Sequence, residues 1–196
     1  STRNFSHLSE EVFFDSSLEA QGEAYERLHN YSEAKKCYHQ MLGLKPDNHE
    51  TLLKLATLLR KLAEFPEAQE YIDKALAIGT KQNNEEIIHQ AQIQQGLICQ
   101  DQGKFEEAEN YFKSILEVYK KKFGENSPEV ARCLNNLGSA WQELGLNAMA
   151  YLEHALGLRI KTLGENHADV AITYNNLGNE HRYLGDYKKA IECYKK

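Results

Sequence analysis

Long hydrophobic runs are absent from this sequence of 196 residues. No stretch of about 18 consecutive apolar residues occurs, so we expect no membrane-spanning helix. Residues 1–20 show no apolar core behind a basic start, so no signal peptide is predicted. An excess of basic residues is also missing. The net charge of −6 argues against nucleic-acid binding, because contacts to phosphates rely on Lys and Arg.

Proline and cysteine are scarce. Only three prolines occur, which is compatible with long helices. The four cysteines, Cys37, Cys99, Cys133 and Cys193, include no CxxC pair, and each falls within a helical pattern. Free thiols in a reducing compartment fit this spacing better than a disulfide framework does. We therefore expect a cytoplasmic protein, and 41% hydrophobic and 27% charged residues are typical of a folded one.

The common catalytic and cofactor motifs are missing as well. The eight histidines show no HExxH pattern or other paired metal spacing, and no phosphate-binding GxxxxGK[ST] or GxGxxG sequence occurs. His29 and the pair Glu153–His154 lie in helical patterns without a matching Cys or Asp, as surface or packing residues do. The sequence therefore predicts a protein that is not an enzyme and that binds no cofactor or metal.

What the sequence does contain is an internal repeat. A small residue recurs at Gly22, Ala56, Gly96, Gly138 and Gly178. In four units an alanine follows 12 residues later, and a large apolar residue comes four positions after it: Ala34 and Tyr38, Ala68 and Ile72, Ala108 and Phe112, Ala190 and Tyr194. Glycine within a helix is tolerated where two helices approach closely. Each unit therefore reads as two antiparallel helices joined by a tight turn.

This order of small and large residues resembles the tetratricopeptide repeat over nearly the whole chain. We place repeats at about 15–48, 49–82, 89–130, 131–170 and 171–196, the last of them truncated. The resemblance implies an all-α, right-handed α-solenoid of antiparallel helix pairs that forms a single domain over residues 1–196. From about residue 84 onward, the longer units with their GENSPEVA and GENHADVA connectors resemble the kinesin light chain type of this repeat.

Repeat 4 and the two ends of the chain depart from the regular pattern. If Ala148, Leu152 and Ala155 pack against the first helix, the alanine comes ten residues after Gly138 instead of twelve, which predicts a tighter or distorted turn at residues 144–148. Because repeat 5 stops midway through its second helix, we expect the chain to be part of a longer protein. At the other end, Ser9–Glu10–Glu11 predicts a helix start after eight frayed residues.

The tetrapeptide NNLG occurs at residues 135–138 and again at 175–178. With about 100° per residue on a helical wheel, its Leu and Gly join the packing stripe and its two Asn residues face away. In the relatives, first helices line a concave groove in which Asn residues hold a peptide main chain. The resemblance implies the same role for Arg132, Asn135, Asn136, Ser139, Gln142, Asn175, Asn176, Asn179 and Arg182. Alternatively, these Asn residues bond to a neighbouring helix, cap a local backbone group or are solvated.

The predicted function is a non-catalytic protein–protein interaction scaffold that binds a peptide or partner segment in the concave groove. Two alternatives stay open: a substrate-docking or regulatory arm of a larger enzyme or signalling protein, and self-association through the uncapped C-terminal repeat. Relatives that bind the C-terminal carboxylate of chaperones carry Lys and Asn on the first helix of repeat 1. Glu19 and Glu23 stand at those positions here, so we do not expect that carboxylate site.

Overall fold

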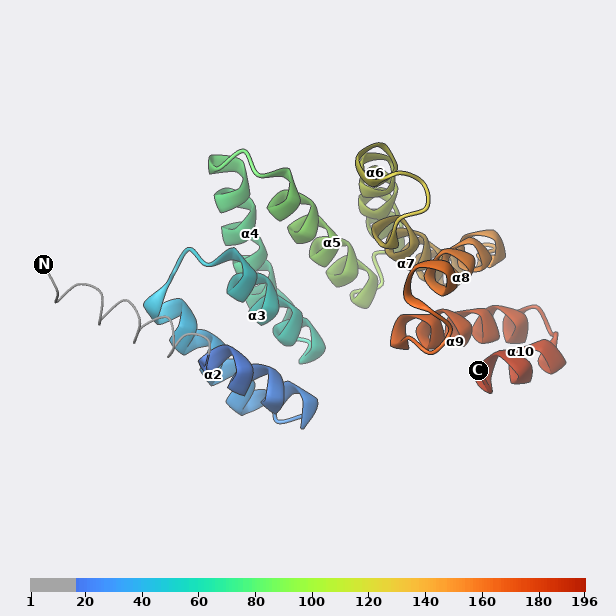
Figure 1. Ribbon diagram of the computed structural model, residues 1–196, viewed down its shortest axis with the longest axis horizontal. Coiled ribbons are helices and arrows are strands. Elements are labelled where there is room, and N and C mark those ends of the chain that lie inside the picture. Colours follow the sequence, from blue (N-terminus) through green and yellow to red (C-terminus); the bar gives the residue numbers. More distant parts are fainter. Residues whose placement is uncertain (1–16) are drawn as a thin grey trace, which may run out of the picture. The chain divides into compact units, whose positions relative to one another are not determined.

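The computed structural model describes residues 17–196, and every regular element in that range is an α-helix. The predicted all-α class is therefore confirmed. After the helical residues 17–27, the helices are α2 (Tyr31–Leu44), α3 (His49–Lys61), α4 (Phe65–Lys81), α5 (Glu85–Asp101), α6 (Phe105–Phe123), α7 (Pro128–Glu143), α8 (Met149–Leu163), α9 (Ala168–Tyr183) and α10 (Tyr187–Tyr194) (Figure 1). The predicted helix start at Ser9–Glu10–Glu11 and the eight residues before it lie outside the described residues.

The chain forms two compact units that meet at Gln94 and Gln95, within α5. The first contains residues 17–27, α2, α3, α4 and the first part of α5, and the second contains the remainder of α5 with α6 to α10. In the first unit α3 packs against α2 and α4, and in the second α7 packs against α6 and α8. Each helix thus buries its apolar stripe against its neighbours in sequence.

The repeated glycines lie where the two helices of a pair come closest. A Cβ atom placed on Gly96 would lie 2.7 Å from Cε1 of Phe112, and one on Gly138 would lie 2.5 Å from Cδ2 of Leu152. Both large side chains are fully buried. These glycines are therefore needed for close helix approach, and the small-to-large pairing read from the sequence describes the contact between the helices of each pair.

The connection between α7 and α8 is distorted, as predicted, but it is not tighter. Residues 144–148 lie outside both helices, whereas only residues 184–186 separate α9 from α10. Ala148, Leu152 and Ala155 are fully buried, which confirms the predicted packing set. Relative to the packing alanine, α8 begins four positions later than α10 does, which outweighs the longer connection and leaves Ala148 as the N-cap residue of α8.

Candidate functional site

The nine residues predicted to bind a peptide all lie on α7 and α9, which are first helices of successive pairs in the second unit. Helix α9 packs against both α7 and α8. Two amide contacts join α7 to α9. The Nε2 of Gln142 donates a hydrogen bond of 2.8 Å to the backbone oxygen of Asn176, and the Nδ2 of Asn176 donates one of 3.2 Å to Oδ1 of Asn135.

The two NNLG segments differ in what covers their first asparagine. Asn135 is only 6% exposed, because α9 packs over it and Asn176 bonds to its side chain. Asn175 holds the corresponding position on α9 and is exposed. Bonding to a neighbouring helix, the alternative interpretation of these residues, thus describes the contact that Asn135 makes in this structure.

Further polar contacts run along the first helices of the second unit. The Nε2 of Gln100 on α5 donates to Oγ of Ser139 on α7 at 2.7 Å. On the last pair, the hydroxyl of Tyr194 donates to Oδ1 of Asn179 at 2.8 Å. Ser139 and Asn179 are both half-buried. Each keeps hydrogen-bonding capacity beyond these contacts, since a hydroxyl has two acceptor sites and a donor and an amide has two donors.

Three of the nine residues are exposed and unengaged. The side chains of Arg132, Asn175 and Arg182 form no hydrogen bond or ion pair with any other residue in the described part of the chain. The two guanidinium groups each offer five N–H donors in a planar fork that matches a carboxylate. We call the nine residues together the α7–α9 surface. It combines exposed cations with half-buried amides whose orientation is fixed by neighbours.

The first helices of the first unit carry a different arrangement. The ammonium of Lys54 on α3 lies 2.5 Å from Oε1 of Glu19 and 2.7 Å from Oε1 of Glu23. The hydrogen bond from Lys54 lowers the pKa of Glu23. Lys61 pairs similarly with Glu26 at 2.8 Å. Glu19 and Glu23 are therefore occupied by a neighbouring lysine, and this surface is largely neutralised by its own ion pairs.

Sequence reasoning missed two buried charged residues that fix α9 against α8. Oε1 of Glu180, a residue that is 1% exposed, accepts a hydrogen bond of 3.1 Å from the backbone N–H of Ala148. The buried guanidinium of Arg159 donates to the backbone oxygen of Asp169 at 2.7 Å and to Oγ1 of Thr173 at 2.6 Å. Burial lowers the pKa of Arg159. Both residues could have been found in the sequence, because each is a charged residue within the apolar stripe of its helix.

Within residues 17–196 no group of three or more His, Cys, Asp or Glu side chains is placed to hold a metal ion. In the same range no helix is long and apolar enough to cross a bilayer. All four cysteines are free, and burial raises the pKa of Cys133 to about 12. A thiol with so high a pKa is a poor nucleophile near neutral pH.

Comparison with known families covers most of the chain. The sequence profile described as Tetratricopeptide repeat matches residues 26–87, 87–150 and 140–196. No curated protein matches the sequence.

Solved structures show the same fold. BtubC (BKLC) from P. vanneervenii is 25% identical with a TM-score of 0.72, over 92% of this chain and 76% of that one. The putative kinesin light chain repeats of Podosopora anserina are 19% identical with a TM-score of 0.66, over 92% and 91%. A Rap protein complexed with Competence and Sporulation Factor is 21% identical with a TM-score of 0.76, over 89% and 50%. The α-solenoid fold and the likeness to kinesin light chain repeats, both predicted from the sequence, are thus confirmed.

Proposed function

Because the chain belongs to the tetratricopeptide repeat family, whose repeats generally mediate protein–protein interactions, we propose that the α7–α9 surface binds a peptide segment of a partner protein. The observation that carries this proposal is the set of exposed, unengaged side chains of Arg132, Asn175 and Arg182 on two adjacent first helices. Polar groups without a partner in the folded chain are available to a ligand at no cost in broken internal bonds.

The chemistry of the surface favours an extended segment that carries carboxylates. Arg132 and Arg182 can each form charge-assisted, bidentate hydrogen bonds with an Asp or Glu of the partner. The amide of Asn175 offers donors and an acceptor, which is what a peptide main chain requires. Recognition of the main chain by amides and of acidic side chains by arginines would be selective for charge and tolerant of the remaining sequence.

The members of the set that bond to one another would support binding indirectly. Asn135, Gln142 and Asn176 link α7 to α9 and so hold the exposed residues in a fixed arrangement. The half-buried Asn136, Ser139 and Asn179 present smaller polar surfaces beside them. A surface that is organised before binding loses less entropy on capture of a ligand.

Site-specific crosslinking tests where a partner binds. A photo-crosslinking amino acid is placed at position 175, and a matched variant carries it at position 110, an exposed asparagine on the second helix α6. We expect the partner recovered from the native source to crosslink from position 175 and not from position 110. Equal crosslinking from both positions, or crosslinking from position 110 alone, would place the partner elsewhere.

The segment mapped by crosslinking then serves as a peptide for affinity measurements. Arg132→Ala and Asn175→Ala are compared with Asn110→Ala as the control. Loss of a hydrogen bond to a charged group costs about 1.5–3 kcal/mol, so we expect Arg132→Ala to weaken binding at least about tenfold. Unchanged affinity in both variants, with helicity intact by circular dichroism, would refute the proposal.

Exposed apolar side chains on the last helix pair favour self-association as a second candidate function. The exposed side chains of α9, α10 and the connection between them include Tyr183, Leu184, Tyr187, Ile191 and Tyr194. Helix α9 packs against both helices of the preceding pair, α7 and α8, and covers that side of the pair. A second copy could cover the α9–α10 face in the same way. Light scattering over a range of concentrations tests this, and a constant monomer mass throughout would count against it.

Two further expectations accompany the proposal. We propose that the helix pairs act as one repeat domain over residues 1–196, although two compact units are distinguishable within it. Limited proteolysis that separated the units at residues 94–95 before any other cut would oppose this. We also propose a cytoplasmic location, where the four free thiols would stay reduced. Fractionation of cells that express the protein tests this second point.

A further inference from the structure

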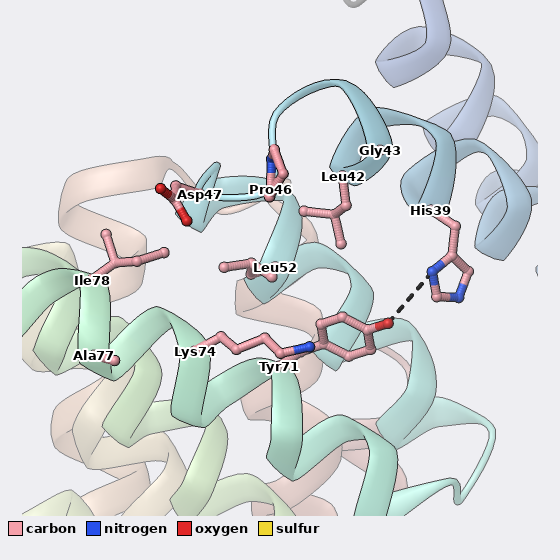
Figure 2. A pocket seen from close by; sticks show the side chains of 10 residues that line it. All are labelled: His39, Leu42, Gly43, Pro46, Asp47, Leu52, Tyr71, Lys74, Ala77 and Ile78. Atoms are coloured by element: carbon pink, nitrogen blue, oxygen red, sulfur yellow. Dashed lines mark hydrogen bonds between the residues drawn. The ribbon is translucent and has the colours of Figure 1, made fainter.

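A hollow of about 580 Å3 lies between the second helices α2 and α4. Its walls and floor come from these two helices, from residues 46–47 of the connecting loop and from α3, as Figure 2 shows. Leu42, Leu52 and Ile78 give it an apolar floor. We call it the α2–α4 groove. Its volume is within the range of about 300–1,000 Å3 that is typical of ligand sites.

One end of the α2–α4 groove is polar and carries a cation. The hydroxyl of Tyr71 and Nδ1 of His39 are 3.4 Å apart, and the ammonium of Lys74 lies 4.7 Å from the centre of the Tyr71 ring (Figure 2). Lys74 forms no ion pair with any residue between 17 and 196, while His39 lies 3.9 Å from a carboxylate of Glu67. The carboxylate of Asp47 lies among the residues of the loop, across from this end. The groove therefore pairs an apolar floor with the positive charge of Lys74 at one end and the carboxylate of Asp47 at the other.

The second unit contains a groove in the same register, and it lacks this charge. A hollow of about 460 Å3 lies between α6 and α8, and its Tyr151 corresponds to Tyr71, three residues after the packing alanine of each helix. Its two lysines are already paired: Lys113 with Glu109 at 2.7 Å and Lys120 with Glu117 at 3.2 Å. The α6–α8 groove thus provides an internal control of similar shape but without an unpaired lysine.

We propose that the α2–α4 groove is a second docking site, which takes a partner segment with a large apolar side chain beside a carboxylate. The apolar side chain occupies the floor of Leu42, Leu52 and Ile78, where removal of apolar surface from water stabilises the complex. The carboxylate lies at the Tyr71 end, where it accepts hydrogen bonds from the ammonium of Lys74 and the hydroxyl of Tyr71. Because the groove is formed by α2, α3, α4 and residues 46–47 of the first unit, this site shares no residue with the α7–α9 surface.

A designed peptide tests the chemistry directly. The probe is a ten-residue Gly/Ser peptide with a central Glu–Phe–Glu, so that a carboxylate flanks the apolar side chain on either side. Binding is followed by the backbone amide shifts of the 15N-labelled chain. We expect the largest shifts at Gly43, Ala77 and Ile78. Peptides with Ser in place of Phe, or Lys in place of both Glu residues, should bind at least tenfold more weakly, and equal binding of the three peptides would overturn the proposal.

Matched variants test the location. Ala77→Trp fills the α2–α4 groove from an exposed position and should abolish binding, whereas Ala150→Trp in the α6–α8 groove should leave it unchanged. Lys74→Glu should weaken binding at least tenfold, and Lys81→Glu, on the same helix but outside the groove, should not. Largest shifts at α9 amides, or equal loss in each variant and its control, would overturn the proposal. Because the α7–α9 surface carries exposed arginines and can itself attract an acidic peptide, shifts at the α2–α4 groove and shifts at α9 are scored separately, and the Ala77→Trp and Lys74→Glu variants report on the groove alone.

Discussion

The same substitution at the two NNLG glycines should have unequal effects on stability. A Cβ atom on Gly138 would lie 2.5 Å from Cδ2 and 2.7 Å from Cγ of Leu152, a residue with no exposed surface. A Cβ atom on Gly178 would lie equally close to the ring of Tyr194. That tyrosine is 45% exposed, so its ring has room to turn aside.

The magnitudes follow from two opposing terms. Alanine is favoured over glycine within a helix by about 1 kcal/mol. Overpacking against a side chain that cannot move costs about 1–3 kcal/mol. We therefore expect Gly138→Ala to lower the free energy of unfolding by up to about 2 kcal/mol. Gly178→Ala gains the helix term but loses the hydrogen bond from Tyr194 to Asn179, which is worth about 1 kcal/mol, so its net effect should be close to zero.

Urea unfolding monitored by Trp141 measures the difference. This residue is the single tryptophan of the chain and packs on the cluster that contains Leu152. With a slope of about 2 kcal/mol per M urea, a loss of about 1–2 kcal/mol moves the midpoint down by roughly 0.5–1 M. Circular dichroism on the same samples checks that loss of helix and the change in fluorescence coincide. Equal destabilisation by both substitutions, or none by Gly138→Ala, would refute the reasoning.

Three further predictions concern buried or ion-paired groups. Replacing Glu180 by Ala removes a buried hydrogen bond to the start of α8 and should cost about 1–3 kcal/mol in urea unfolding, whereas removal of the exposed Glu192 should cost nothing measurable. Because the hydrogen bond from Lys54 lowers the pKa of Glu23 from 4.5, this pair stabilises the fold above that value and loses its contribution as the pH falls through the lowered pKa. Thermal unfolding between pH 3 and 7 should show the loss, and a Lys54→Met variant should show less of it. The thiol of Cys133, with a pKa of about 12, should react with a disulfide reagent only after unfolding, and rapid labelling in native buffer would contradict its burial.

The fold was largely predictable because the packing pattern is local. Each helix pair is specified by a small residue that meets a large one some 14–16 positions later, as in Gly96 with Phe112 and Gly138 with Leu152. The boundaries of a helix were also predictable where a capping residue is recognisable in the sequence. Ser127, for example, accepts a hydrogen bond from the N–H of Val130 just before α7. Helix-pair contacts and caps of this kind depend on residues that are close in the sequence.

The candidate site was less predictable, because the exposure of its residues depends on the next helix pair along the chain. A helical wheel places Asn135 and Asn175 alike, away from the packing stripe of their own pair. Helix α9 then covers Asn135, and within the described residues no further pair covers Asn175. The α2–α4 groove was likewise not visible in the sequence, since it depends on how far two second helices stand apart over α3.

The amino-acid sequence by itself determined the helix pairs, the tetratricopeptide family and the residues at which helices touch, because these follow from periodicity and side-chain volume. The tertiary structure decided which polar residues remain free. Asn135 links two helices and Glu180 caps α8. Among the described residues, the side chains of Arg132 and Asn175 have no hydrogen-bond or ion-pair partner, and Lys74 has no ion-pair partner. The physical reason is that burial and hydrogen bonding between helix pairs depend on the angle at which neighbouring pairs pack. Helical periodicity carries no information on that angle.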